Sequence, residues 1–106
     1  MKFFPNRSSD IEVVLRNKRP SKSNICSGYR PAFKVKEDYL TTGVIRLITV
    51  DELSYDNETM AEILFITPEA YPNCLKVGQV IQFQEGCTIH GFATITKIKN
   101  KILETK

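Results

Sequence analysis

Apolar and polar residues alternate along most of this chain, in short runs separated by Gly, Pro, Asn and Asp. Successive side chains of an extended strand point to opposite faces, so a period of two predicts strands with one buried face. Regularly spaced short strands of this kind are typical of a closed antiparallel barrel or a sandwich. Six runs follow the pattern, at residues 11–16, 32–36, 43–47, 59–67, 80–84 and 89–98.

The fourth run has an alternative interpretation. Met60, Ala61 and Leu64 have the spacing of a helix face, which would fit one helix over residues 51–65. The β-branched and aromatic residues in the second half of the chain favour a strand instead, and Pro68 would end it. We therefore predict a strand here.

Turn and packing signals favour the same class of fold. Glu85-Gly86 has the length and chemistry of a tight hairpin between the last two runs. Within the last run, Gly91 and Ala93 would let a neighbouring backbone or a bulky side chain approach closely. A length of 106 residues suits one hydrophobic core. We predict one all-β domain over residues 1–106, with six antiparallel strands.

Composition and cysteine pattern indicate the cellular compartment in which the protein is expected. The chain is 42% apolar and 25% charged, as soluble globular proteins are, and no stretch approaches the roughly 20 apolar residues of a membrane span. The first residues include no apolar run long enough for a signal peptide. Cys26, Cys74 and Cys87 form no CxxC pair, which is typical of free thiols in a reducing compartment. We expect a cytoplasmic protein that does not bind membranes.

Charge is unevenly distributed although the net charge is only +3. Residues 16–36 include seven basic and no acidic side chains, whereas residues 37–75 include eight acidic side chains and one basic. The longest connection, a basic and Ser-rich loop at 17–28, belongs to the first segment. Such asymmetry fits either a face that attracts an anionic partner or charged loops that keep a small barrel soluble.

Several motifs occur in a specific order. A Gly-Tyr-Arg-Pro at 28–31 opens the second run, a Thr-Gly at 42–43 follows it, and a Glu-Gly at 85–86 precedes the last run, with Gly91 after it. In this order and spacing they resemble the C-terminal (third) β-barrel domain of elongation factor Tu and related translational GTPases. The resemblance covers about residues 11–98 of the chain.

The resemblance implies a six-stranded Greek-key barrel, which in that family packs against the GTPase domain. In elongation factor Tu the domain also contacts the T-stem backbone of aminoacyl-tRNA and helps to hold the nucleotide-exchange factor. Thr42, Glu85 and Gly86 occupy positions that the family associates with the T-stem contact. The arginine that follows Glu-Gly in the family is replaced here by Thr88.

Catalytic motifs are missing from the chain. GTP hydrolysis requires the phosphate loop GxxxxGK[ST], which does not occur, so we expect no nucleotide binding and no cofactor. Cys87 and His90 would point to opposite faces of a strand, which disfavours a metal site with Cys26 and Cys74. His90 has no recognisable nucleophile and orienting acid. We predict that the chain is not an enzyme; a metal or redox enzyme would rest on the cysteines alone.

Two binding functions are left open by the sequence. The first is a protein-interaction barrel that mimics the third domain of elongation factor Tu or regulates a partner; the acidic 51–69 segment and Thr88 favour it. The second is a barrel that binds the phosphate backbone of tRNA or ribosomal RNA, with aromatic stacking. The candidate contact residues for either partner are Arg16, Lys18, Arg19, Lys22, Tyr29, Arg30, Thr42, Glu85 and Gly86.

Overall fold

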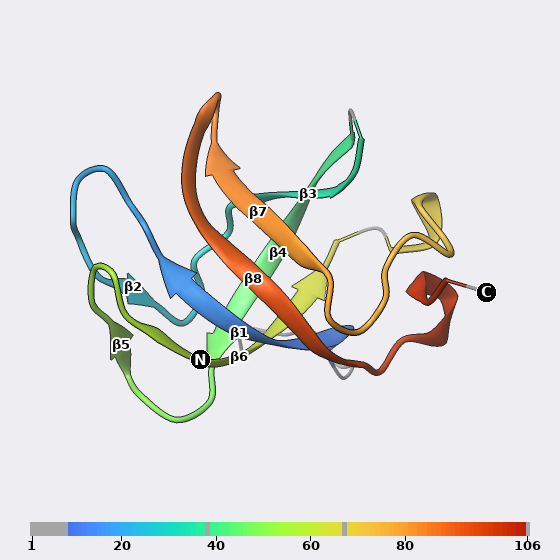
Figure 1. Ribbon diagram of the computed structural model, residues 1–106, viewed down its shortest axis with the longest axis horizontal. Helices are drawn as coiled ribbons and strands as arrows, with labels where there is room; N and C mark the ends of the chain where they lie inside the picture. The colour runs from blue at the N-terminus through green and yellow to red at the C-terminus, as the bar shows by residue number, and fades with distance from the viewer. Residues whose placement is uncertain (1–8, 38, 67, 106) are drawn as a thin grey trace.

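The computed structural model describes residues 9–37, 39–66 and 68–105, which fold into a closed barrel (Figure 1). Every neighbouring pair of barrel strands is antiparallel, and β8 pairs with β1 to close the cylinder. The strands are β1 (Ile11–Asn17), β2 (Ile25–Cys26), β3 (Ala32–Lys36), β4 (Tyr39–Leu47), β5 (Glu52–Leu53), β6 (Glu58–Phe65), β7 (Val80–Glu85) and β8 (Thr88–Ile98). Two short 3₁₀ turns, η1 (Pro68–Ala70) and η2 (Lys101–Leu103), complete the secondary structure of the described residues.

The order of strands around the barrel is β1-β6-β4-β3-β7-β8. β3, β4 and β6 are consecutive barrel strands and are neighbours in space. The barrel strand that precedes them in the chain, β1, lies beside β6, the last of the three. This is a Greek key. The predicted all-β class with a six-stranded antiparallel barrel is confirmed, and the helical interpretation of residues 51–65 is wrong because that segment forms β5 and β6.

The structure differs from the expected strands at a few places. β4 begins at Tyr39, four residues before the predicted start, because the segment up to Thr42 pairs with β3. The small sheet formed by β2 and β5 was not predicted, since each strand has two residues and no period can be read from two positions. The predicted fourth strand extends to Thr67, which lies outside the described residues.

The barrel interior is filled by the inward face of each strand. Phe33, Phe65, Phe83 and Tyr71 are fully buried, and their rings meet at centroid distances of 5.7–5.9 Å. Edge-on and tilted pairs of this kind favour a well-packed aromatic core. Tyr71 follows η1 and shares a hydrogen bond of 3.0 Å with Thr41, while burial raises the pKa of Tyr71 to about 12.

Two glycines let strands approach these rings. A Cβ built on Gly91 would lie 2.2 Å from Cζ of Phe83 and 2.3 Å from the backbone oxygen of Arg16. A Cβ on Gly43 would lie 2.8 Å from the ring of Phe33. Real Cβ atoms do not come so close to other atoms, so only glycine fits. The prediction that Gly91 permits a close approach is confirmed.

Candidate functional site

The basic residues at the end of β1 are already paired. Arg16 lies 2.9 Å from a carboxylate oxygen of Glu58 and 3.4 Å from Asp56, and Lys18 lies 2.7 Å from the same Asp56 oxygen. These contacts raise the pKa of Lys18 and lower that of Asp56, chiefly through their shared hydrogen bond. Asp56 and Glu58 therefore pair with two of the seven cations that the sequence places in residues 16–36.

A second group of side chains meets at one oxygen of Glu85. Tyr29 donates a hydrogen bond of 2.5 Å to Oε2 of Glu85, Arg19 lies 3.7 Å from that oxygen, and Nδ1 of His90 lies 3.5 Å from it. The Arg19 guanidinium also stacks over the Tyr29 ring, 4.8 Å from its centroid, and Tyr29 packs on Phe83 at 6.1 Å. The structure thus brings together three of the predicted residues, Arg19, Tyr29 and Glu85.

This Glu85 cluster, made of Arg19, Tyr29, Glu85 and His90, joins the 17–28 loop to the β7–β8 hairpin. Burial, and then the hydrogen bond to Glu85, raise the pKa of Tyr29 well above its usual range, so the phenol stays protonated. Nε of Arg19 and Nδ1 of His90 are buried without a hydrogen bond to a described residue. The cluster can hold a loop in place, but a protonated phenol hydrogen-bonded to a carboxylate supplies no activated nucleophile.

The remaining predicted residues lie apart from this cluster or at its edge. Lys22 lies over the Tyr55 ring, 5.7 Å from its centroid, and Arg30 is exposed. Thr42 is exposed and pairs with Ala32 across β3 and β4. Gly86 has a φ of +58° in the β7–β8 turn, as a tight hairpin requires. Lys22 shares the Tyr55 ring with Lys18, whose Nζ lies 5.6 Å from the ring centroid, so Lys22 belongs beside the paired cations at the end of β1.

An apolar row crosses the outside of the barrel. Val80 is opposite Thr94, Thr94 is opposite Val14, and Val14 is opposite Met60 in the strand pairing. The backbone N–H of Ile48 then donates to the Met60 carbonyl at 3.1 Å, which places Ile48 next in the row. We call these five residues the apolar row.

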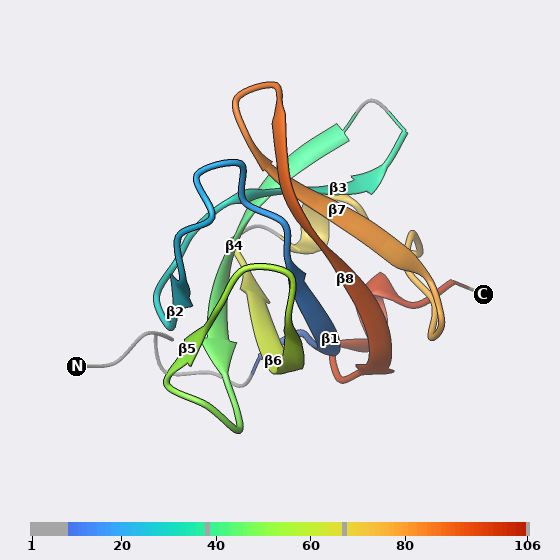
Figure 2. The ribbon, with the colours of Figure 1, turned by 60° about the vertical axis from the view of Figure 1, so that its left-hand side comes forward.

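The row faces outward because its neighbours along each strand face the core. Ile81, Val13, Ala61 and other adjacent residues are buried, so the alternate positions must point out. Val80 and Ile48, at the two ends, expose 58% and 48% of their surface. Figure 2 shows β6, β1 and β8 side by side, which is the wall that carries the centre of the row.

Ion pairs border the apolar row on both sides. On one side Arg16 pairs with Glu58, and Phe92 stands between Arg16 and Gln82 in the register. On the other side lies the group of Glu12, Glu62, Arg46 and Lys99, in which Glu62 contacts both Arg46 and Lys99. An apolar centre with a charged rim is the usual anatomy of a protein–protein interface.

Glu62 is the centre of that charged group. Only 8% of its side chain is exposed, and it accepts hydrogen bonds from Ser9, Lys99 and Arg46. Burial alone would raise the pKa of Glu62, but these three donors outweigh burial and lower it to about 2. The carboxylate is therefore ionised and fully used within the barrel.

The three cysteines do not form a reactive centre. Cys26 and Cys87 are exposed and Cys74 is half-buried, and desolvation raises the pKa values of Cys26 and Cys74. A raised pKa keeps a thiol protonated and a poor nucleophile. Within residues 9–37, 39–66 and 68–105, no three His, Cys, Asp or Glu side chains are grouped closely enough to hold a metal ion. In the same ranges, no helix has the length and apolarity to cross a bilayer.

Neither of two comparisons with known proteins finds a match. No protein-family model matches the sequence, and no curated protein matches it.

The apolar row was missed by sequence reasoning, although part of its signal was present. Val14 and Val80 are apolar residues on the face of their runs that otherwise carries Glu12, Arg16, Gln82 and Gln84. Apolar residues at single outward positions are common and indicate nothing by themselves. Only the strand register shows that four such residues align around Thr94.

Proposed function

We propose that this chain is a non-catalytic, protein-binding barrel of the cytoplasm, related to the third domain of elongation factor Tu, that acts as a mimic of that domain or as a regulatory partner. The observation that carries the proposal is the apolar row. Its residues lie on four strands and, with Ile48, just after the end of β4, and its ends at Val80 and Ile48 are about half exposed. Apolar surface with a polar rim marks interaction sites on soluble proteins.

The charges near the row favour a protein over a nucleic acid as the partner. Each phosphate contact needs a cation that is free to replace a counterion. Arg16, Lys18 and Arg19 each contact a carboxylate within the barrel. A protein surface with apolar side chains at its centre and charges of both signs at its edge suits this wall better than a phosphate backbone does.

The Glu85 cluster supports a structural role for Glu85, one of the three residues that the family associates with T-stem contact. Tyr29 and Arg19 both use their polar groups on Glu85, 56 and 66 positions away along the chain respectively. Such contacts fix the 17–28 loop against the hairpin. They leave the loop as a rigid border for a partner.

RNA binding is the second candidate, and Arg30 is the observation that favours it. Arg30 is exposed two residues before β3, next to Tyr29 in the sequence, and Lys22 is exposed in the 17–28 loop. Two cations support weak, strongly salt-dependent binding at most. Filter binding of tRNA across a salt series measures it, and negligible binding at low salt excludes it.

A nuclease-treated pull-down from the native cytoplasm tests the protein-binding proposal. The tagged wild-type chain should retain a stoichiometric protein partner, and Val80→Lys and Ile48→Lys should each reduce its recovery at least tenfold, as loss of a buried apolar contact at an interface does. Ile102→Lys is the matched control, because Ile102 is 41% exposed but lies in η2, away from the row. Equal recovery by all four proteins would contradict the assignment of the row.

A further inference from the structure

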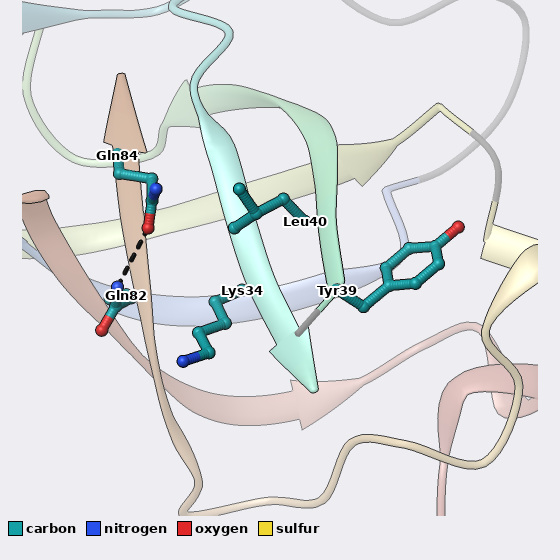
Figure 3. Close-up of a pocket in the computed structure, with 5 residues that line it drawn as sticks. All are labelled: Lys34, Tyr39, Leu40, Gln82 and Gln84. Carbon is teal, nitrogen blue, oxygen red and sulfur yellow. Dashed lines mark hydrogen bonds between the residues drawn. The ribbon is translucent and has the colours of Figure 1, made fainter. Parts of the chain in front are cut away.

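A hollow of about 280 Å³ lies on the outside of the barrel where β3 and β7 separate (Figure 3). Lys34, Tyr39, Leu40, Gln82 and Gln84 line it. Pairing between β3 and β7 is limited to Ala32 with Gln84 and Phe33 with Phe83, so the strands diverge beyond that point. The hollow thus forms beside the pair of neighbouring barrel strands that shares the fewest paired residues.

Two kinds of hydrogen-bond donor face this hollow. Lys34 contributes an ammonium group from β3, and Gln82 contributes a carboxamide from β7. Nε2 of Gln84 donates to the Gly86 carbonyl at 2.6 Å, and its Oε1 accepts from Nε2 of Gln82 at 3.0 Å (Figure 3). This relay uses one N–H of the Gln82 amide, which has a second N–H to donate, and Gln82 and Lys34 both line the hollow.

The ammonium group of Lys34 is only weakly engaged. Among the residues that the structure describes, its nearest carboxylate is that of Glu37 at 3.8 Å, and the Glu37 side chain is 85% exposed. Exposed pairs at such distances contribute little and exchange readily with solvent. Lys36, whose Nζ lies 5.4 Å from the centroid of the Tyr39 ring, adds a second positive charge near the rim.

The hollow adjoins exposed apolar surface on both sides. Leu40, on its rim, is 48% exposed, and Val80, the next outward residue of β7 before Gln82, is 58% exposed. Phe92 lies opposite Gln82 across β7 and β8. The apolar row therefore begins directly beside the hollow.

We propose that this hollow receives the carboxylate of an acidic side chain from the partner protein, within a segment whose flanking residues are apolar. One carboxylate oxygen pairs with Nζ of Lys34 and the other accepts from Nε2 of Gln82, while the flanking side chains cover Leu40 and Val80. The proposal rests on the proposed protein-binding function and adds the chemistry of the partner's contact segment. Arg16 and Lys18 lie 2.9 Å and 2.7 Å from a carboxylate oxygen, whereas Lys34 lies 3.8 Å from the exposed Glu37 carboxylate. Lys34 can therefore exchange this contact for one with a partner protein.

A pair of short peptides tests this site without knowledge of the partner. N-acetyl-Leu-Glu-Leu-amide and its Gln counterpart differ only in the carboxylate, and each is titrated into the ¹⁵N-labelled full chain. We expect the acidic peptide to shift the side-chain amide signals of Gln82 and Gln84 and to bind about two- to fivefold more tightly than its counterpart, the range of an exposed ion pair. The advantage should shrink at high salt, which screens an exposed pair.

Lys34→Gln should remove the difference between the two peptides. Lys97→Gln is the control, because Lys97 is an exposed lysine on β8 opposite Glu12, outside the hollow. Thermal unfolding of both variants verifies that they fold. Equal binding of the two peptides to the wild type, or an acidic advantage that survives in Lys34→Gln, would overturn the proposal. So would the same signals shifting with acetate alone, since that result identifies a site for free carboxylates.

The pull-down separates this inference from the proposed function. A partner that depends on Ile48 but is retained equally by wild type and Lys34→Gln would overturn the carboxylate site and leave protein binding in place. A partner lost in both Ile48→Lys and Lys34→Gln supports both. If the wild type retains no protein, protein binding is contradicted, and the peptide titration alone decides the chemistry of the hollow.

Discussion

Two bands of side chains run next to each other around the outside of this barrel, and they differ in whether the fold already supplies their partners. In the charged band, Glu62 contacts both Arg46 and Lys99, and three donors surround its carboxylate. In the apolar row, Val80 and Ile48 leave about half of their surface exposed to water. The charges of the charged band are used within the barrel, whereas the apolar row leaves surface for another molecule.

This difference changes how a charged sequence segment should be interpreted. A run of cations attracts anions only if the folded chain leaves those cations free. Here Arg16 and Lys18 meet Asp56 and Glu58, which lie across from them at the same end of the antiparallel β1–β6 pair. The surface that is available for binding therefore cannot be read from the distribution of charge along the sequence.

The largest expected effect comes from breaking the charged band. Glu62→Gln keeps the size of the side chain but leaves Lys99 and Arg46 without their shared carboxylate. We expect the free energy of unfolding to fall by about 2–3 kcal/mol, slightly less than for a fully buried pair because Arg46 is half exposed. Chemical denaturation measures it. Glu58→Gln, which removes an exposed partner of Arg16, should change stability by no more than about 0.5 kcal/mol.

Acid should weaken the ion pairs of Glu62 in the charged band and so lower the free energy of unfolding. The pKa of Glu62 is about 2 in the fold and ordinarily 4.5, so its contribution of about 3 kcal/mol is complete above pH 4.5 and is lost as the pH falls toward 2. The slope of stability against pH between these values should be markedly smaller in Glu62→Gln. A variant with the same acid slope as the wild type would show that other carboxylates dominate acid unfolding.

A smaller effect is expected at the Glu85 cluster. Glu85→Gln removes the charged acceptor of Tyr29, and since Glu85 is half exposed the loss should be about 1 kcal/mol or less. The pKa of Tyr29 should fall, because the hydrogen bond to Glu85 helps to raise it. Ultraviolet titration measures the pKa, and hydrogen exchange should become faster in the 17–28 loop. Unchanged exchange there would contradict the anchoring role.

The smallest effect on stability is expected in the apolar row. Val80→Lys and Ile48→Lys replace half-exposed side chains and should change the unfolding free energy by no more than about 0.5 kcal/mol each. The same variants should lose the partner protein. In the apolar row, then, a substitution should reduce binding without reducing stability, whereas Glu62→Gln should reduce stability. A loss of stability as large as that of Glu62→Gln would show that the row supports the fold.

Much of the barrel could be predicted from local pattern. Inward residues such as Ile63 and Phe83 alternate with outward ones, and Gly91 signals a close approach that the Phe83 ring occupies. β2 and β5 escaped prediction because pairs of residues carry no periodicity. Among the candidate site residues, Arg19, Tyr29 and Glu85 are brought together, yet the hydrogen bond between Tyr29 and Glu85 joins residues 56 positions apart.

The order of residues along the chain determined on its own that each run would be a strand and which of its faces would be buried, because a two-residue period acts within a single strand. Only the closed barrel decided which outward residues became neighbours, because register is set between strands distant in sequence. Val14, Met60 and Val80 form one row, and Lys34 faces Gln82 across a seam, only after the cylinder closes. Apolar surface available to a partner is therefore a property of strand register, which no single segment encodes.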